Sequence, residues 1–165
     1  EIRPILLSEQ IYETPRKEQK NLPSIFKPAF VCSLLLLLSL LIFIIEKKRK
    51  KQAIWFDISI FSITGLIGIV ISYLMLFSEH PLVANNWNLL WANPLNLIFG
   101  ALLLKKSIRK YLIYYQYINC ALLIAALLIF VVKIQSFNIA FLPLITLILI
   151  RAALYIGNYK KNSPQ

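Results

Sequence analysis

The sequence predicts an all-α fold, a polytopic integral membrane bundle of five transmembrane helices. Composition is the first reason, because the 165 residues are 59% hydrophobic and only 15% charged, with a mean hydropathy of +0.70. A soluble domain of this length needs more charge on its surface. Distribution is the second reason, because the apolar residues form long blocks and the basic residues cluster where those blocks end. The net charge of +11 therefore indicates membrane topology, and we do not expect nucleic-acid binding.

Each apolar block is long enough to cross a bilayer, since a helix needs about 20 apolar residues, with a range of roughly 17 to 25, to do so. Backbone groups in lipid must be satisfied within their own segment, so each block is expected to be a helix. The expected helices are residues 29–45, 54–77, 87–104, 111–132 and 137–156. Together they form an expected transmembrane domain of residues 29–157, which a tail of residues 158–165 follows.

The charges of the loops predict the orientation of the bundle. Five Lys and Arg residues lie between positions 47 and 51, and four lie between positions 105 and 110. The loop after the second helix has none, and the loop after the fourth has only Lys133. Because basic loops stay inside, the C-terminus is expected in the cytoplasm and the N-terminus outside.

Residues 1–28 differ in kind from the apolar blocks. They contain four prolines, five basic residues and four glutamates, and they show no signal-peptide pattern. We interpret them as the end of a larger preceding part followed by a short linker to the membrane, so we expect this chain to be the C-terminal part of a longer protein.

Asp57 is the only carboxylate inside an apolar block. It shares a helix face with Thr64 and Gly68, part of a stripe of small residues suited to close packing, so it is expected to point into the bundle. One interpretation is a proton relay or an acid–base group. The other is a structural ion pair with a cation on the cytoplasmic side, such as Arg151 or Arg109.

Arg151 lies in the last third of the fifth block, five residues before Ile156. Its long side chain is expected to extend along the helix to the inner headgroups.

The stretch SEHPLVANNWNLLWANPLNLIFG, residues 78–100, holds five asparagines and no Lys or Arg. It is expected to form the outer loop and the outer half of the third helix, which Pro94 should kink or interrupt. Trp87 and Trp91, four residues apart, are expected on one helix face at the outer boundary. The polar side chains near them are those of Asn86, Asn88, Asn93 and Asn96. Their amides could bind lipid esters or peptide groups beside the loosened backbone, or they could fix the bundle through interhelical hydrogen bonds.

Glu79 and His80 stand side by side at the start of this stretch. They could act as an acid–base pair at the same site, or they could belong to a hydrated loop. The lone histidine offers no metal-ligand cluster, so neither a metal nor another cofactor is expected. Cys32 and Cys120 lie in separate apolar blocks and are expected to be small buried hydrophobes.

The sequence resembles a known family at WFDISIFSITGLIG, residues 55–68, and at SEHPLVANNWNLLWANPLNLI, residues 78–98. It is similar to the C-terminal five-helix transmembrane domain of Lnb-like proteins, the lipoprotein N-acyltransferases of Bacteroidota. The N-x-N element of the family is Asn86-Trp87-Asn88 here, and the last element runs from Trp91 to Leu95. The resemblance covers nearly the whole chain, including EIRPILLSEQIYETP, which resembles the tail of the periplasmic domain.

The resemblance implies that this chain is part of an enzyme that acylates the N-terminal amine of a diacylated lipoprotein, with a membrane phospholipid as acyl donor. The catalytic cysteine would lie in a thiol-protease-like periplasmic domain before this chain, and no catalytic residue is expected within it. The partners implied are phospholipid, lipoprotein substrate and the protein's own N-terminal periplasmic domain. This part would be a multi-pass domain of the bacterial inner (cytoplasmic) membrane with its N-terminus in the periplasm. There it would anchor the catalytic domain and present both substrates at the outer face.

Two alternatives remain beside this interpretation. The chain could be an inert membrane anchor for a periplasmic domain of other function. It could also be a small transporter, although transporters usually show paired broken helices or more intramembrane charge.

Overall fold

The computed structural model describes residues 27–78, 86–135 and 138–162, and all its regular elements in these ranges are helical. The long helices are α1 (Pro28–Arg49), α2 (Ile54–Phe77), α4 (Leu112–Val132) and α5 (Phe141–Asn162). All four are long and apolar enough to cross a membrane. The predicted fold class, a helical membrane bundle, is confirmed.

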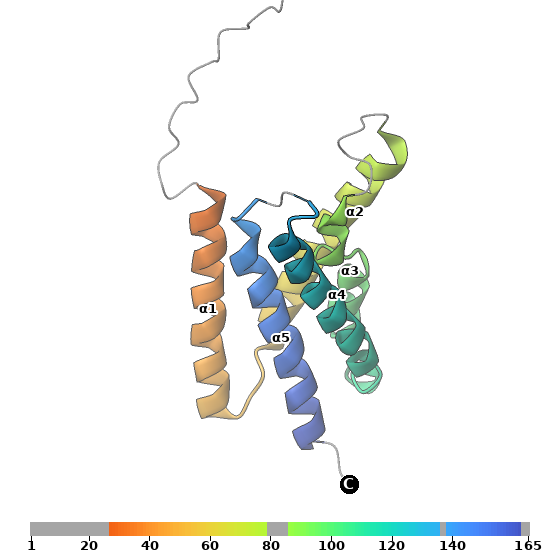
Figure 1. The fold of residues 1–165 in the computed structure, drawn as a ribbon. Coiled ribbons are helices and arrows are strands. Elements are labelled where there is room, and N and C mark those ends of the chain that lie inside the picture. Colours follow the sequence, from red (N-terminus) through yellow and green to blue (C-terminus); the bar gives the residue numbers. More distant parts are fainter. Residues whose placement is uncertain (1–26, 79–85, 136–137, 163–165) are drawn as a thin grey trace, which may run out of the picture.

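The third predicted helix is the exception, because residues 87–104 do not form one continuous helix. The structure has a short 3₁₀ turn, η2 (Trp87–Leu90), and then the short helix α3 (Leu95–Leu102). A second 3₁₀ turn, η3 (Lys106–Ile108), leads into α4. The break falls where Pro94 lacks a backbone N–H and would crowd the carbonyl of Leu90. With eight residues, α3 is only about 12 Å long, yet the third element as a whole still runs along the bundle (Figure 1).

Two other elements differ from the expected limits. α1 continues past residue 45 to Arg49, and the basic residues of its last turn favour a helix C-terminus electrostatically. α5 begins at Phe141 rather than 137 and continues to Asn162. The side chain of Asn138 accepts a hydrogen bond from the backbone N–H of Ala140, which forms a turn before α5 begins.

In the bundle, α5 lies between α1 and α4, while α2 packs against α3 (Figure 1). α1 is the outermost helix and contacts mainly α5. Its buried residues are Cys32, Ser39 and Glu46, which are spaced seven apart and form a single narrow stripe. Most of the leucine and isoleucine side chains around that stripe are exposed, as expected of a helix that faces lipid.

Glycines allow α2 and the third element to pack at backbone distance. A Cβ on Gly68 would overlap the carbonyl oxygen of Ala92, and one on Gly65 would overlap the backbone of Leu97. From the other side, Gly100 of α3 faces the hydroxyl of Ser62 on α2. The small-residue face of α2 therefore packs on the interrupted third element, where van der Waals contact replaces the hydrophobic effect as the driving force.

Replacement of Gly68 by alanine should destabilise the bundle, because the new methyl group must displace the backbone of Ala92. We expect a loss of at least about 1–3 kcal/mol, the usual cost of overpacking. Gly157→Ala is the matched control, since nothing lies within 4 Å of a Cβ there. That substitution should be neutral or stabilising by about 0.5–1 kcal/mol, because alanine favours a helix. Thermal unfolding in detergent measures both, and equal melting temperatures would refute the close packing.

Candidate functional site

The interrupted segment, defined here as residues 86–97, is held by the side chains of its own asparagines. Asn86 Oδ1 accepts hydrogen bonds from the backbone N–H of Asn88 at 3.1 Å and from Asn88 Nδ2 at 2.7 Å. Asn88 Oδ1 in turn accepts the indole N–H of Trp91 at 2.8 Å. Short polar side chains compete well for backbone groups outside regular helices, so these residues favour a turn over a continuous helix.

The second half of the segment is fixed to its surroundings in the same way. Asn93 Oδ1 accepts the backbone N–H of Leu95, the first residue of α3, at 2.9 Å, so this N–H has a partner although the helix has none to offer it. Asn96 is fully buried, and its Oδ1 accepts the hydroxyl of Tyr115 on α4 at 2.7 Å. Its Nδ2 donates to the carbonyl of Trp91 at 3.5 Å. The hydrogen bond between Asn96 and Tyr115 joins two helical elements. It therefore agrees with the interpretation that the asparagines fix the bundle through interhelical hydrogen bonds.

The expected shared face of Trp87 and Trp91 is wrong. Trp87 is 44% exposed, whereas Trp91 is 1% exposed and packs on the ring of Phe141 at a centroid distance of 5.1 Å. The chain is 3₁₀ and then irregular over this stretch, so α-helical spacing does not apply to it. For the same reason Asn86 and Asn93 do not share a helix face.

Burial limits which residues of this segment can meet a ligand directly. Trp91 and Asn96 contact protein rather than lipid in this structure. Trp87 is exposed, and Asn86, Asn88 and Asn93 are half-buried. The backbone N–H of Trp87 donates to Gln135 Oε1 at 2.9 Å, and this hydrogen bond joins the segment to the loop after α4. Glu79 and His80 lie outside the described residues.

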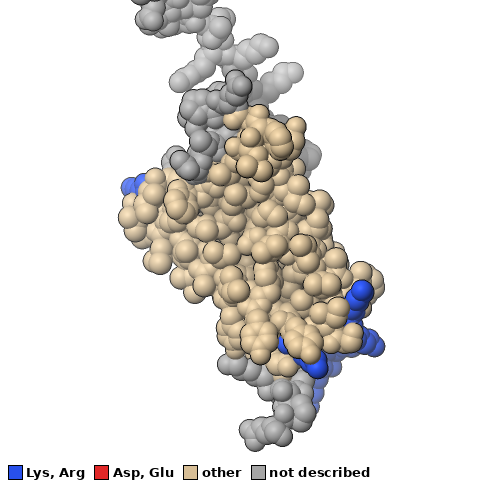
Figure 2. All heavy atoms as spheres, turned by 90° about the vertical axis from the view of Figure 1, so that its right-hand side faces the viewer, with Lys and Arg blue, Asp and Glu red and all other residues tan. Residues whose placement is uncertain are grey.

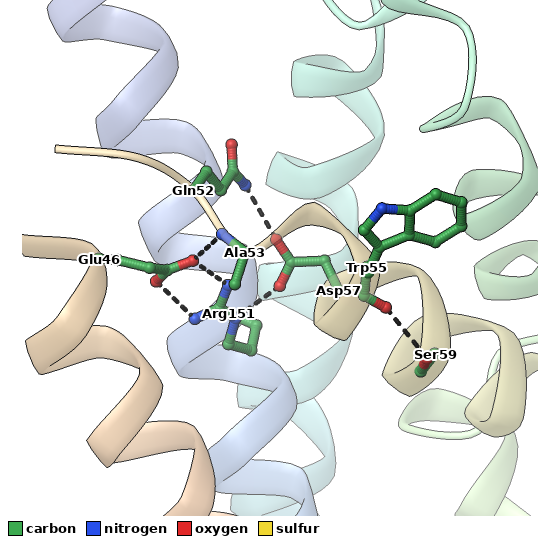
Figure 3. A network of polar contacts seen from close by, with 7 residues as sticks. All are labelled: Glu46, Gln52, Ala53, Trp55, Asp57, Ser59 and Arg151. Carbon is green, nitrogen blue, oxygen red and sulfur yellow. Dashed lines mark hydrogen bonds and ion pairs between the residues drawn. The ribbon is translucent and has the colours of Figure 1, made fainter. Parts of the chain in front are cut away.

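A second group of polar residues lies at the opposite end, where α1, α2 and α5 meet (Figure 3). We call Glu46, Asp57 and Arg151 the ionic network. Arg151 Nε donates to Asp57 Oδ1 at 2.5 Å, and its NH1 and NH2 atoms donate to the two oxygens of Glu46 at 2.8 and 2.9 Å. Arg151 and Asp57 are each 1% exposed and Glu46 is 8% exposed. Desolvated ions of this kind persist only when partners surround them.

Neighbouring groups complete the ionic network. Gln52 Nε2 donates to Asp57 Oδ2 at 2.9 Å, and the backbone N–H of Ala53 donates to Glu46 Oε1. Every carboxylate oxygen of Glu46 and Asp57 thus accepts a hydrogen bond. The arrangement is that of a structural ion pair between Asp57 and Arg151 rather than of a carboxylate exposed to a proton path.

The expectation that Arg151 extends to the headgroups is therefore wrong. α5 continues for eleven residues beyond Arg151, and the guanidinium turns inward to its two carboxylates. Glu46 was not identified as a partner, because in the sequence it stands at the edge of a run of lysines. The only feature of the sequence that could have indicated a partner role is that Glu46 is the single acidic residue beside that run.

Buried amides on α4 were also missed. Gln116 and Asn119 are fully buried, and Asn119 Nδ2 donates to Gln116 Oε1 at 3.1 Å. Spaced three apart, they lie on one face together with Leu112 and Leu123. With Tyr115, they make the inner side of α4 more polar than its apolar sequence suggests. Within the described ranges no group of three or more His, Cys, Asp or Glu could hold a metal ion.

The helices and loops described above define the class of protein. The described residues form four long apolar helices and the interrupted third element, with basic loops at one end, and this is the architecture of a multi-pass membrane domain. Residues 18–162 match the family model of the Lnb transmembrane domain, so the chain belongs to that family and the resemblance noted in the sequence is confirmed. No curated protein and no solved structure matched the chain.

Replacement of Arg151 by methionine should strongly destabilise the protein, since it leaves two buried carboxylates without their cation. The expected loss is about 3–5 kcal/mol, measured by thermal unfolding in detergent. A triple variant, Glu46→Gln with Asp57→Asn and Arg151→Met, should recover part of that loss because no buried charge remains unpaired. Equal stability of the single and triple variants would show that the three charges are not coupled.

Proposed function

We propose that this chain is the membrane domain of a lipoprotein N-acyltransferase-like protein. In this role it anchors a periplasmic thiol-protease-like catalytic domain, which supplies the nucleophilic cysteine, to the inner membrane. It also presents phospholipid and diacylated lipoprotein to that domain at the outer face. The observation that carries the proposal is the match to the Lnb transmembrane domain over residues 18–162.

The interrupted segment is the proposed place of presentation. It lies away from the basic loops, which the orientation rule assigns to the cytoplasm. Its half-buried amides suit neutral ester and peptide groups, and Trp87 is an aromatic side chain of the kind that favours the headgroup level. Trp91 and Asn96 support this surface from inside through their hydrogen bonds.

The transporter alternative receives no support from the described residues. They contain one interrupted element, whereas transporters of repeat architecture usually have a pair. The inert-anchor alternative differs from the proposal only in whether the interrupted segment affects acylation.

The proposed orientation rests on the distribution of charge. Figure 2 shows Lys and Arg gathered mainly at the lower end of the visible face, with a belt free of charged side chains above them and a smaller basic patch near the upper end. By the positive-inside rule, this asymmetry supports an orientation with the lower end in the cytoplasm.

Cysteine labelling tests the orientation. On a background with Cys32 and Cys120 replaced by alanine, Ile134→Cys should react with a membrane-impermeant reagent in intact spheroplasts. Ile134 is 63% exposed and lies in the loop after α4. Ser107→Cys, in the basic loop before α4, should react only after the membrane is permeabilised. The reverse pattern would invert the topology.

Truncation of Trp87 tests presentation. In the full-length protein, Trp87→Ala should lower lipoprotein N-acylation by roughly tenfold, the loss expected when an aromatic anchor is removed from a binding surface. Asn86→Ala should act in the same direction, because it releases the turn that begins at Trp87. The measurement is mass spectrometry of lipoprotein N-termini from cells that carry each variant at normal expression.

Trp55→Ala is the matched control, since Trp55 is 75% exposed at the opposite end of the bundle. Its acylation level should remain that of the unmodified protein. If both Trp87→Ala and Asn86→Ala also acylate normally, the segment is only structural and the inert-anchor alternative holds.

A further inference from the structure

A cavity of about 400 Å³ opens beside the ionic network, at the basic end of the bundle. The C-terminal turn of α1, the loop to α2 and the second half of α5 surround it. Its lining residues are Phe43, Glu46, Lys47, Lys50, Lys51, Gln52, Leu154 and Asn158. This cavity is separate from the interrupted segment and has no part in the proposed function.

The lining combines two kinds of chemistry. Phe43 and Leu154, from α1 and α5, form an apolar wall. Three lysines and the amides of Gln52 and Asn158 supply polar groups in the same cavity. A cationic loop that contacts only water needs no apolar wall. An amphipathic anion is bound best where cationic groups and an apolar wall lie side by side.

Charge in the cavity is positive in sum. Glu46 is neutralised by Arg151, and the ionic network as a whole has two carboxylates against one guanidinium, a formal charge of −1. Against this, Lys47, Lys50 and Lys51 contribute +3, which leaves an excess of +2. The low-dielectric helices on either side strengthen the attraction for an anion.

Lys50, one of the three lysines of the cavity, follows the last turn of α1. Lys50 ends α1 in the left-handed region with φ of 51°, a position at which glycine is the usual residue. A non-glycine residue there has a steric cost. Lys50 therefore carries a backbone cost that glycine at this position would avoid.

We propose that this cavity binds the headgroup of an anionic phospholipid, with the phosphodiester at the three lysines and the start of an acyl chain against Phe43 and Leu154. Basic pockets between transmembrane helices on the cytoplasmic side are suited to such headgroups. A lipid bound here bridges α1, the loop and α5 at the same place where the ionic network joins them.

Lipid-dependent thermal stability tests the site. The full-length protein in neutral detergent is titrated with phosphatidylglycerol, with phosphatidylethanolamine and with inorganic phosphate. Phosphatidylglycerol should raise the melting temperature in a saturable way, and the other two should not. A full response to inorganic phosphate alone would assign the site to free phosphate and overturn the lipid proposal.

Variants locate the effect. Substitution of Lys47, Lys50 and Lys51 by glutamine should weaken the apparent affinity for phosphatidylglycerol at least about tenfold, since each lysine near an anionic lipid contributes on the order of 1 kcal/mol. The matched control replaces Lys105, Lys106 and Lys110 by glutamine, with the same change of charge in the other basic loop. An equal loss in both triple variants would mean non-specific surface attraction and would overturn the proposal.

Lys50→Gly separates binding from folding. Glycine relieves the left-handed backbone, so the lipid-free protein should unfold at the same temperature or higher, while the affinity for phosphatidylglycerol falls. Unchanged lipid affinity in this variant and in the Lys47/Lys50/Lys51 variant would also refute the site.

Discussion

The pairing of one arginine with two carboxylates sets the arrangement of the bundle at its basic end. Arg151 on α5 reaches Asp57 on α2 and Glu46 on α1, so three helices that are distant in sequence share one set of hydrogen bonds. Apolar packing alone is weakly specific in lipid, because the alternative to helix contact is an equally apolar tail. A desolvated charge has few acceptable environments, and this requirement selects one register among the three helices.

At the other end of the bundle, neutral polar groups rather than charges fix how the elements pack. The side chains of Asn86, Asn93 and Asn96 bond backbone groups of the interrupted segment that have no helical partner, and Tyr115 joins Asn96 to α4. The backbone of the segment can then approach α2 at Gly65 and Gly68 without a layer of side chains between them. A break in a membrane helix is tolerated where its backbone is covered by protein, and Trp91, Ala92 and Asn96 are buried at this break.

Sequence reasoning identified the four long helices, because twenty-residue apolar blocks have few other structures available in lipid. It also located the break, because the effect of Pro94 on a helix is local. It failed where the outcome depended on distant residues or on an assumed helical period. Glu46 and Arg151 are separated by 105 positions, and nothing near either residue in the sequence identifies the other. Trp87 and Trp91 were placed on one face only because a period of 3.6 was continued through a stretch that does not have it.

The narrow stripe of α1 has a mechanical consequence. Its only charged anchor, Glu46, lies near the end of the helix, about 27 Å from Pro28 at the helical rise per residue. Along the rest of its length α1 is held only by its apolar contact with α5. A tilt of α1 would therefore act on α5 along this contact, whereas it would reach α2 mainly through the guanidinium that links Glu46 to Asp57.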